Sequence, residues 1–99
     1  MAHGEYKTPG GKLVQVDFTV ANDLIRQPVI SGDFFLYPDE ALEPMTAALD
    51  GLPVTSNEDA IASAVRLATP TGTDLVGTSP EGIAIAVRRA IAAIEGGDR

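Results

Sequence analysis

The chain is predicted to fold as an α+β domain, in which three helices pack on one face of a three-stranded antiparallel sheet. Two observations carry this prediction. Every second residue from Val14 to Val20 is apolar, as in a strand with one buried face. After Pro38 the apolar spacing changes to that of helices. Strands that precede helices favour α+β over an alternating α/β fold. With 99 residues, 44% of them hydrophobic, residues 1–99 are expected to form a single domain with one modest core.

The expected strands of this sheet are residues 12–21, 24–31 and 33–37. Asn22 and Asp23 both tolerate positive φ and fit a two-residue hairpin turn between the first two strands. Pro28 lacks an N–H, which places the second strand at an edge or at a bulge. Residues 1–5, which precede the first strand, are expected to be mobile.

The expected helices are residues 38–50, 57–69 and 80–95. In the first, Pro44 either kinks the helix or leaves residues 38–42 as a separate first turn. Ser56 resembles the start of a capping box for the second helix, and Ser79 fits the N-cap of the third. Residues 70–79, between these two helices, are expected to form a loop.

Charge and composition exclude several classes of function. The net charge of −7 argues against nucleic acid or an anionic membrane surface as the main partner. There is no cysteine, and the single histidine, His3, cannot build a histidine-rich metal site, so no metal site is expected. No stretch suits a membrane span or a signal peptide, and a cytoplasmic location is expected. Lys7 and Lys12 are the only lysines, while Arg88 and Arg89 are expected on a solvated helix surface.

The stretch 7–13 combines a proline, two glycines and the two lysines. Pro9 fixes its own φ, and Gly10 and Gly11 can adopt positive φ or let another group approach the backbone. Successive N–H groups in such a turn can form an anion-binding concavity. The alternative is a surface turn that only introduces a strand. It is not a P-loop, because Tyr6 stands where the first glycine is required and a leucine replaces the hydroxyl residue.

A run of apolar side chains, Phe-Phe-Leu-Tyr, occupies residues 34–37. Alternate side chains of a strand point to opposite faces, so one set would fill the core. The other set is either covered by the chain's own helices or available to a partner, since aromatic residues are enriched at interface centres. No complete catalytic constellation accompanies this run. Asp39, Glu40 and Glu43 are interpreted as the exposed first turn of a helix rather than as acid–base residues.

Two blocks of sequence occur in order with a hairpin between them. Residues 6–13 read Tyr-Lys-Thr-Pro-Gly-Gly-Lys-Leu, and residues 30–38 read Ile-Ser-Gly-Asp-Phe-Phe-Leu-Tyr-Pro. A helix ending in Ala-Leu-Asp-Gly-Leu follows at 48–52. This order resembles the C-terminal domain of lipoate–protein ligases, over roughly residues 6–95 and more weakly after the first helix. Because no large catalytic domain lies between its first and last residues, the chain resembles the separately encoded small subunit of a bipartite ligase.

The resemblance implies a fold similar to that of iron–sulfur scaffold and sulfur-acceptor proteins. It also implies a heterodimer with a large catalytic subunit, which uses ATP and Mg²⁺ to activate lipoate as lipoyl-AMP. The lipoyl group would then pass to a lysine of a lipoyl domain. The pocket and the catalytic lysine would belong to the large subunit, so no catalytic residue and no activity are expected of this chain alone.

Under this resemblance, the turn is expected near the acyl-adenylate or its phosphate through Lys7, Gly10, Gly11 and Lys12. The interface with the large subunit is expected to include Pro9, Phe34, Phe35 and Tyr37. Two alternatives remain open: an adaptor that binds a partner without affecting its chemistry, and an iron–sulfur assembly scaffold, which the absence of cysteine disfavours.

Overall fold

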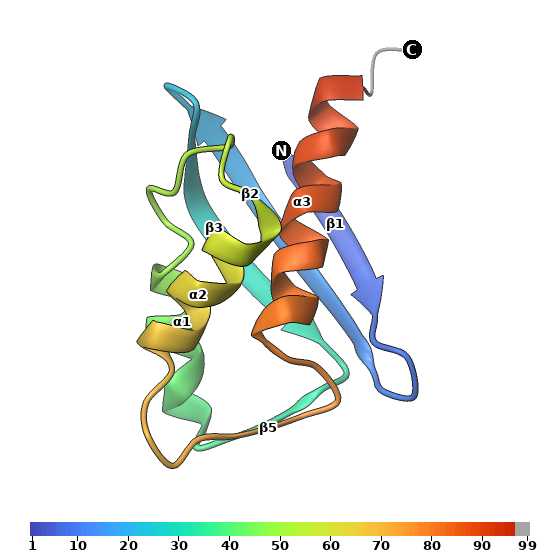
Figure 1. Cartoon of the computed structure of the whole chain (residues 1–99), viewed down its shortest axis with the longest axis vertical. Coiled ribbons are helices and arrows are strands. Elements are labelled where there is room, and N and C mark those ends of the chain that lie inside the picture. Colours follow the sequence, from blue (N-terminus) through green and yellow to red (C-terminus); the bar gives the residue numbers. More distant parts are fainter. Residues whose placement is uncertain (97–99) are drawn as a thin grey trace.

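The computed structural model describes residues 1–96, and in it a three-stranded antiparallel sheet carries three helices (Figure 1). The strands β1 (Ala2–Lys7), β2 (Leu13–Ala21) and β3 (Leu24–Gly32) lie side by side in that order. The remaining elements are β4 (Phe35–Tyr37), the 3₁₀ turn η1 (Asp39–Ala41), α1 (Leu42–Ala47), α2 (Glu58–Ala68), β5 (Asp74–Val76) and α3 (Pro80–Gly96). The predicted α+β class is confirmed.

The hairpin of β2 and β3 forms as its sequence predicts. Asn22 and Asp23 have φ values of 56° and 63°, which suit a two-residue turn between twisted strands. Further along β3, Gln27 has a φ of 55° and the register with β2 shifts, which marks a β-bulge. Pro28 follows that bulge, and β3 is an edge strand of the three-stranded sheet. The proline therefore lies next to a bulge and on an edge strand, the two positions predicted for it.

The expectation that residues 1–5 are mobile is wrong for β1, which pairs with β2 from Ala2 to Lys7. Ala2 and Gly4 face the core rather than solvent. A Cβ atom on Gly4 would stand 2.0 Å from the carbonyl oxygen of Ala86, so glycine lets the backbone of α3 approach this strand closely. Because two of its three inward residues, Ala2 and Gly4, are small and only Tyr6 is large, β1 lacks the hydrophobic alternation that reveals β2.

The expected third strand, 33–37, is also corrected, because β4 lies outside the main sheet. It pairs instead with β5, which lies within the stretch 70–79 that was expected to be a loop. The Asp33 N–H donates to the carbonyl of Leu13 and ends the pairing with β2, after which the chain departs from the sheet. β4 and β5 form a two-stranded ribbon at one end of the molecule, where Figure 1 labels β5.

The helices largely follow the sequence. Of the two alternatives for Pro44, the separate first turn is correct: η1 precedes α1, and Pro44 is the third residue of α1, where no intrahelical N–H bond is required. The N-cap of α2 is Asn57, whose side chain accepts a hydrogen bond from the Ala60 N–H at 2.8 Å, and not the predicted Ser56. Ser79 caps α3 as predicted, accepting from the Gly82 N–H at 3.1 Å.

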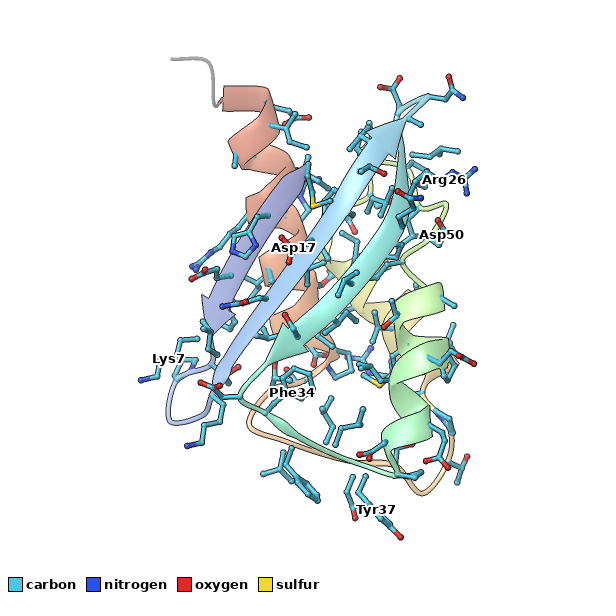
Figure 2. The ribbon with its side chains drawn as sticks, turned by 180° about the vertical axis from the view of Figure 1, so that it is seen from behind. Lys7, Asp17, Arg26, Phe34, Tyr37 and Asp50 are labelled. Atoms are coloured by element: carbon cyan, nitrogen blue, oxygen red, sulfur yellow. The ribbon has the colours of Figure 1, made fainter. Side chains whose placement is uncertain are left out.

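The core lies between the sheet and α3, which crosses β1 and β2, while α2 packs on α3 and α1 lies beside β3 (Figure 1). Its largest fully buried side chains come from all of these layers except β1: Val14, Val16, Phe18, Ile25, Met45, Leu49, Ile61, Val65, Ile83, Val87 and Ile91. Figure 2 shows the opposite face of the sheet, which no helix covers and where Asp17 lies. Within residues 1–96, no helix has the length and apolar character needed to cross a bilayer.

Candidate functional site

The Pro-Gly-Gly-Lys stretch forms the loop that joins β1 to β2. The Gly11 N–H donates to the Thr8 carbonyl at 2.7 Å, and the Thr8 N–H donates to the Lys12 carbonyl at 3.2 Å. Gly10, at the tip, has a φ of 71°, a conformation that favours glycine. The loop is therefore a closed hairpin turn that holds Pro9 and Gly10 at the surface.

This hairpin rests on the segment that leads from β5 into α3. The Lys12 N–H donates to the Gly77 carbonyl at 2.8 Å. A Cβ on Gly11 would stand 2.7 Å from that same oxygen, and a Cβ on Gly77 would stand 2.8 Å from Lys12 Cγ. Gly11 and Gly77 thus allow the hairpin to lie close to the segment between β5 and α3. This contact holds the backbone and the first side-chain carbons of Lys12 beside Gly77, three residues before α3 begins.

Two buried hydroxyl groups lie where the hairpin meets α3. Among the described residues, the Oγ1 atoms of Thr8 and Thr78 are buried and have no hydrogen-bond partner. A Cβ on Gly82 would stand 2.6 Å from Thr78 Oγ1 and 3.2 Å from Thr8 Oγ1, so both hydroxyls reach the first turn of α3. A buried polar atom without a hydrogen-bond partner destabilises the folded state. The contact between the hairpin and α3 is therefore less favourable than the packing of the apolar core.

A hollow of about 350 Å³ lies between the hairpin and the β4–β5 ribbon. It is lined by both elements through Thr8, Pro9, Gly10, Gly11, Lys12, Asp33, Phe35, Val76, Gly77 and Thr78. Phe35 and Val76 are cross-strand partners, and their side chains are 58% and 61% exposed. Tyr37, which Figure 2 places at the outer end of the ribbon, is 62% exposed. The ribbon therefore presents an apolar strip beside the hairpin.

The structure brings together most of the residues singled out from the sequence. Pro9, Phe35 and Tyr37 are exposed at this end of the molecule, whereas Phe34 is partly buried and packs against the core. Val76 was missed. Its role in the strip depends on the pairing of β4 with β5, which joins residues about forty positions apart and leaves no local pattern.

The cations of the turn are both exposed. Within residues 1–96, no carboxylate lies within ion-pair distance of Lys7 or Lys12. The hollow itself is lined by Lys12, which forms no ion pair among these residues, by the carboxylate of Asp33, by bare backbone and by apolar surface, and Lys7 lies outside it. Neither a histidine nor a cysteine lines it, and no cluster of three or more potential metal ligands occurs in the described part of the chain.

Arg88 and Arg89 were expected on a solvated helix surface, and Arg89 is indeed exposed, whereas Arg88 is partly buried. Arg88 donates to the carbonyls of Val54 and Ser56, at 2.9 and 3.1 Å, and holds the loop between α1 and α2. Arg89 donates to the Glu5 carbonyl at 3.1 Å, and its guanidinium lies 5.0 Å from the centre of the Tyr6 ring, which ties β1 to α3. Both arginines serve the fold and lie outside the hollow.

His3 lies on the uncovered face of the sheet between two carboxylates. Its Nε2 is 2.9 Å from Glu5 Oε2, and its Nδ1 is 2.6 Å from Asp17 Oδ1. These hydrogen bonds, first that to Glu5 and then that to Asp17, raise the pKa of His3 above its usual 6.5. The group is exposed and belongs to β1, and it takes no part in the hollow.

Comparison with known proteins gives one informative likeness. No family model matches the chain, and no curated protein matches it. Among solved structures, a chain from an archaeal lipoylation system of Thermoplasma acidophilum, described as a bi-partite lipoate protein ligase and its E2 lipoyl domain, is similar with a TM-score of 0.67. The two are 24% identical, and the match covers 87% of this chain and 92% of that one. The two chains share their fold.

Proposed function

We propose that this chain is the small accessory subunit of an ATP-dependent lipoate–protein ligase. It acts with a large catalytic subunit when lipoate is activated to lipoyl-AMP, before the lipoyl group is transferred to a lysine of a lipoyl domain. The two sequence blocks at 6–13 and 30–38 support this proposal, as does the shared fold with a chain of the Thermoplasma acidophilum lipoylation system. Similar shares of both chains are matched, so the likeness is to a chain of nearly the same length.

The observation that carries the proposal is that Lys12 and Phe35 line one hollow. The hairpin offers charge without a catalytic group, and the neighbouring ribbon offers an apolar strip without a cover. A partner that buries the exposed aromatic side chains of the ribbon would therefore also contact the hairpin. Exposed aromatic residues beside a polar rim are typical of such interfaces. The interface residues of the proposal are Pro9, Phe35, Tyr37 and Val76.

Formation of an acyl-adenylate needs what this hairpin can supply. The carboxylate of lipoate attacks the α-phosphorus of ATP, and pyrophosphate leaves. Positive charge and backbone N–H groups that face the phosphate oxygens stabilise the charge in the transition state, and exclusion of water protects the mixed anhydride. Lys12 would approach the α-phosphate, with Lys7 adding charge, while Gly10 and Gly11 permit close approach of the backbone. ATP, lipoate and Mg²⁺ would be held chiefly by the large subunit.

The test is ATP–pyrophosphate exchange with the purified large subunit, with and without this chain. The proposal predicts that the two chains co-purify, and that lipoate-dependent exchange requires both. An adaptor would co-purify and leave the exchange unchanged, and a scaffold of iron–sulfur assembly would do neither. Mass spectrometry of this chain after the complete reaction should show no lipoyl adduct on Lys7 or Lys12. An adduct there would make the chain an acceptor instead of a ligase subunit.

A further inference from the structure

The outer edge of β3 already accepts one extended segment of the chain. Ile25 directs its backbone away from β2: the Gly51 N–H donates to its carbonyl at 2.7 Å, and its own N–H donates to the Leu52 carbonyl at 2.9 Å. A bridge between Leu24 and Pro53 continues this pairing. The first part of the β3 edge is thus covered by residues 51–53, which follow α1.

Beyond the bulge, the same edge is open. The Asp33 N–H bonds to the carbonyl of Leu13, so hydrogen-bonded pairs recur at every second position of β3, at Ser31 and Val29. Ile30, which lies between them opposite Val16, therefore points its N–H and C=O outward. Among the described residues, no backbone hydrogen bond from outside the sheet reaches Ile30. The open stretch is short, because Pro28 has no N–H to offer.

This open edge forms one wall of a groove of about 1100 Å³, and η1 with α1 forms the other. Apolar lining comes from Pro28, Val29 and Leu42, of which Val29 is more than half exposed. The rim is acidic and carries Asp39, Glu40, Glu43 and Asp50. Its one cation, Arg26, lies 3.6 Å from Asp50. Figure 2 shows this pair at the opposite end of the molecule from Lys7 and Tyr37, and the groove shares no lining residue with the hollow at the hairpin.

We propose that the groove binds an extended segment of a partner protein in which apolar and cationic side chains alternate. The segment adds as a strand to β3 through the N–H and C=O of Ile30, beside α1. A groove between an edge strand and a helix is a recurrent setting for such strand addition. Alternate side chains of the added strand point to opposite faces, so its apolar side chains lie beside Val29 on the uncovered face of the sheet, and its cations lie on the α1 side and face the carboxylates of the rim. A second copy of this chain would set four carboxylates against four, and is disfavoured by charge.

The inference does not rest on the proposed function, and its test needs only the full chain. The probe is a soluble ten-residue peptide of alternating valine or threonine and lysine, titrated into the ¹⁵N-labelled protein and followed by NMR. Amide resonances of Val29, Ile30 and α1 should shift, and hydrogen exchange of the Ile30 amide should slow. A peptide with glutamate in place of lysine should not bind, and one with proline at alternate positions should bind at least tenfold more weakly.

Two charge reversals separate the groove from general attraction to an acidic protein. Glu43→Lys, on the exposed rim, should weaken peptide binding about tenfold. It should leave the midpoint of unfolding and the circular dichroism spectrum unchanged. Glu95→Lys makes the same change of charge on α3, outside the groove, and should alter binding less than twofold. Equal weakening by both variants, shifts centred on residues 8–12, or no binding at millimolar peptide would each overturn the proposal.

Discussion

The sheet face beneath α3 and the hairpin end of the molecule differ in how much apolar surface stays exposed and in how many buried polar atoms lack a hydrogen-bond partner. Under α3, Phe18, Ile25 and Ile83 are fully buried and pack into one apolar cluster. At the hairpin end, Phe35 stays more than half exposed, and the buried hydroxyls of Thr8 and Thr78 lack partners within the described residues. The first region is built for the stability of the chain itself. The second retains apolar surface and unpaired polar atoms, as expected where another molecule completes the structure.

The sharpest contrast is between two phenylalanines. Phe18→Ala should lower the free energy of unfolding by about 3–5 kcal/mol, because it leaves a cavity in a fully packed core. Phe35→Ala removes a side chain that is mostly in water, and should change stability by less than about 0.5 kcal/mol. Urea denaturation followed by circular dichroism measures both. Similar losses from the two variants would break the contrast.

An intermediate loss of stability is expected for Arg88, which lies outside the hairpin end and ties the loop between α1 and α2 to α3. Arg88→Ala removes hydrogen bonds to the carbonyls of Val54 and Ser56, and should lower the free energy of unfolding by roughly 1.5–3 kcal/mol. Arg66, which pairs with Glu81 on the surface, is the matched control. Arg66→Ala should cost less than about 1 kcal/mol, as exposed ion pairs do. Equal costs in thermal or urea unfolding would show that Arg88 does not hold the loop.

At the hairpin end, truncation should affect binding rather than folding. Phe35→Ala and Tyr37→Ala should each weaken the complex with the large subunit about tenfold, the size expected when an aromatic contact at an interface is lost. Leu67→Ala, at an exposed position of α2 outside both the hollow and the groove, is the control and should leave that complex unchanged. Calorimetric titration of the two subunits gives the dissociation constants. An unchanged constant for both aromatic variants would remove the ribbon from the interface.

The smallest effect is expected on the uncovered face of the sheet. Because its hydrogen bonds to Glu5 and Asp17 raise the pKa of His3 in the folded state, folding favours the protonated imidazole. Its stabilising contribution is therefore fully present below pH 6.5 and is lost as the pH rises through the folded-state pKa, which lies above 6.5. NMR titration of the His3 ring should give that higher pKa, and His3→Gln should remove the dependence. Titration at or below 6.5 would contradict the ion pairs.

The elements that were predicted correctly have local signals. The β2–β3 hairpin follows from two-residue alternation and from Asn22-Asp23, and the start of α3 follows from Ser79. The strand β1 was missed because two of its inward residues, Ala2 and Gly4, are small, and at Gly4 the close approach of α3 leaves no room for a side chain. Small residues at every second position of a segment next to a hairpin turn are the signal that could have revealed it.

The candidate site was predicted only in part, for a similar reason. The turn around Gly10 and Gly11 is visible in the sequence, because its chemistry is local. The contact of Lys12 with Gly77 and the exposure of Val76 depend on the pairing of β4 with β5, which joins distant segments. The partners of Arg88 lie 34 and 32 positions away and carry no local trace. The features that the sequence could not reveal are therefore contacts between segments that are distant in the chain and have no clear hydrophobic periodicity.

The central claim is that the hairpin completes a site on the large subunit, and Lys12→Ala tests it most directly. In the complex, lipoate-dependent ATP–pyrophosphate exchange should fall by about 100-fold, the loss typical of removing one group that stabilises developing charge. The dissociation constant of the two subunits should change less than twofold, and Lys12→Arg should restore much of the exchange. Normal exchange by Lys12→Ala, with binding to the large subunit intact, would contradict the claim.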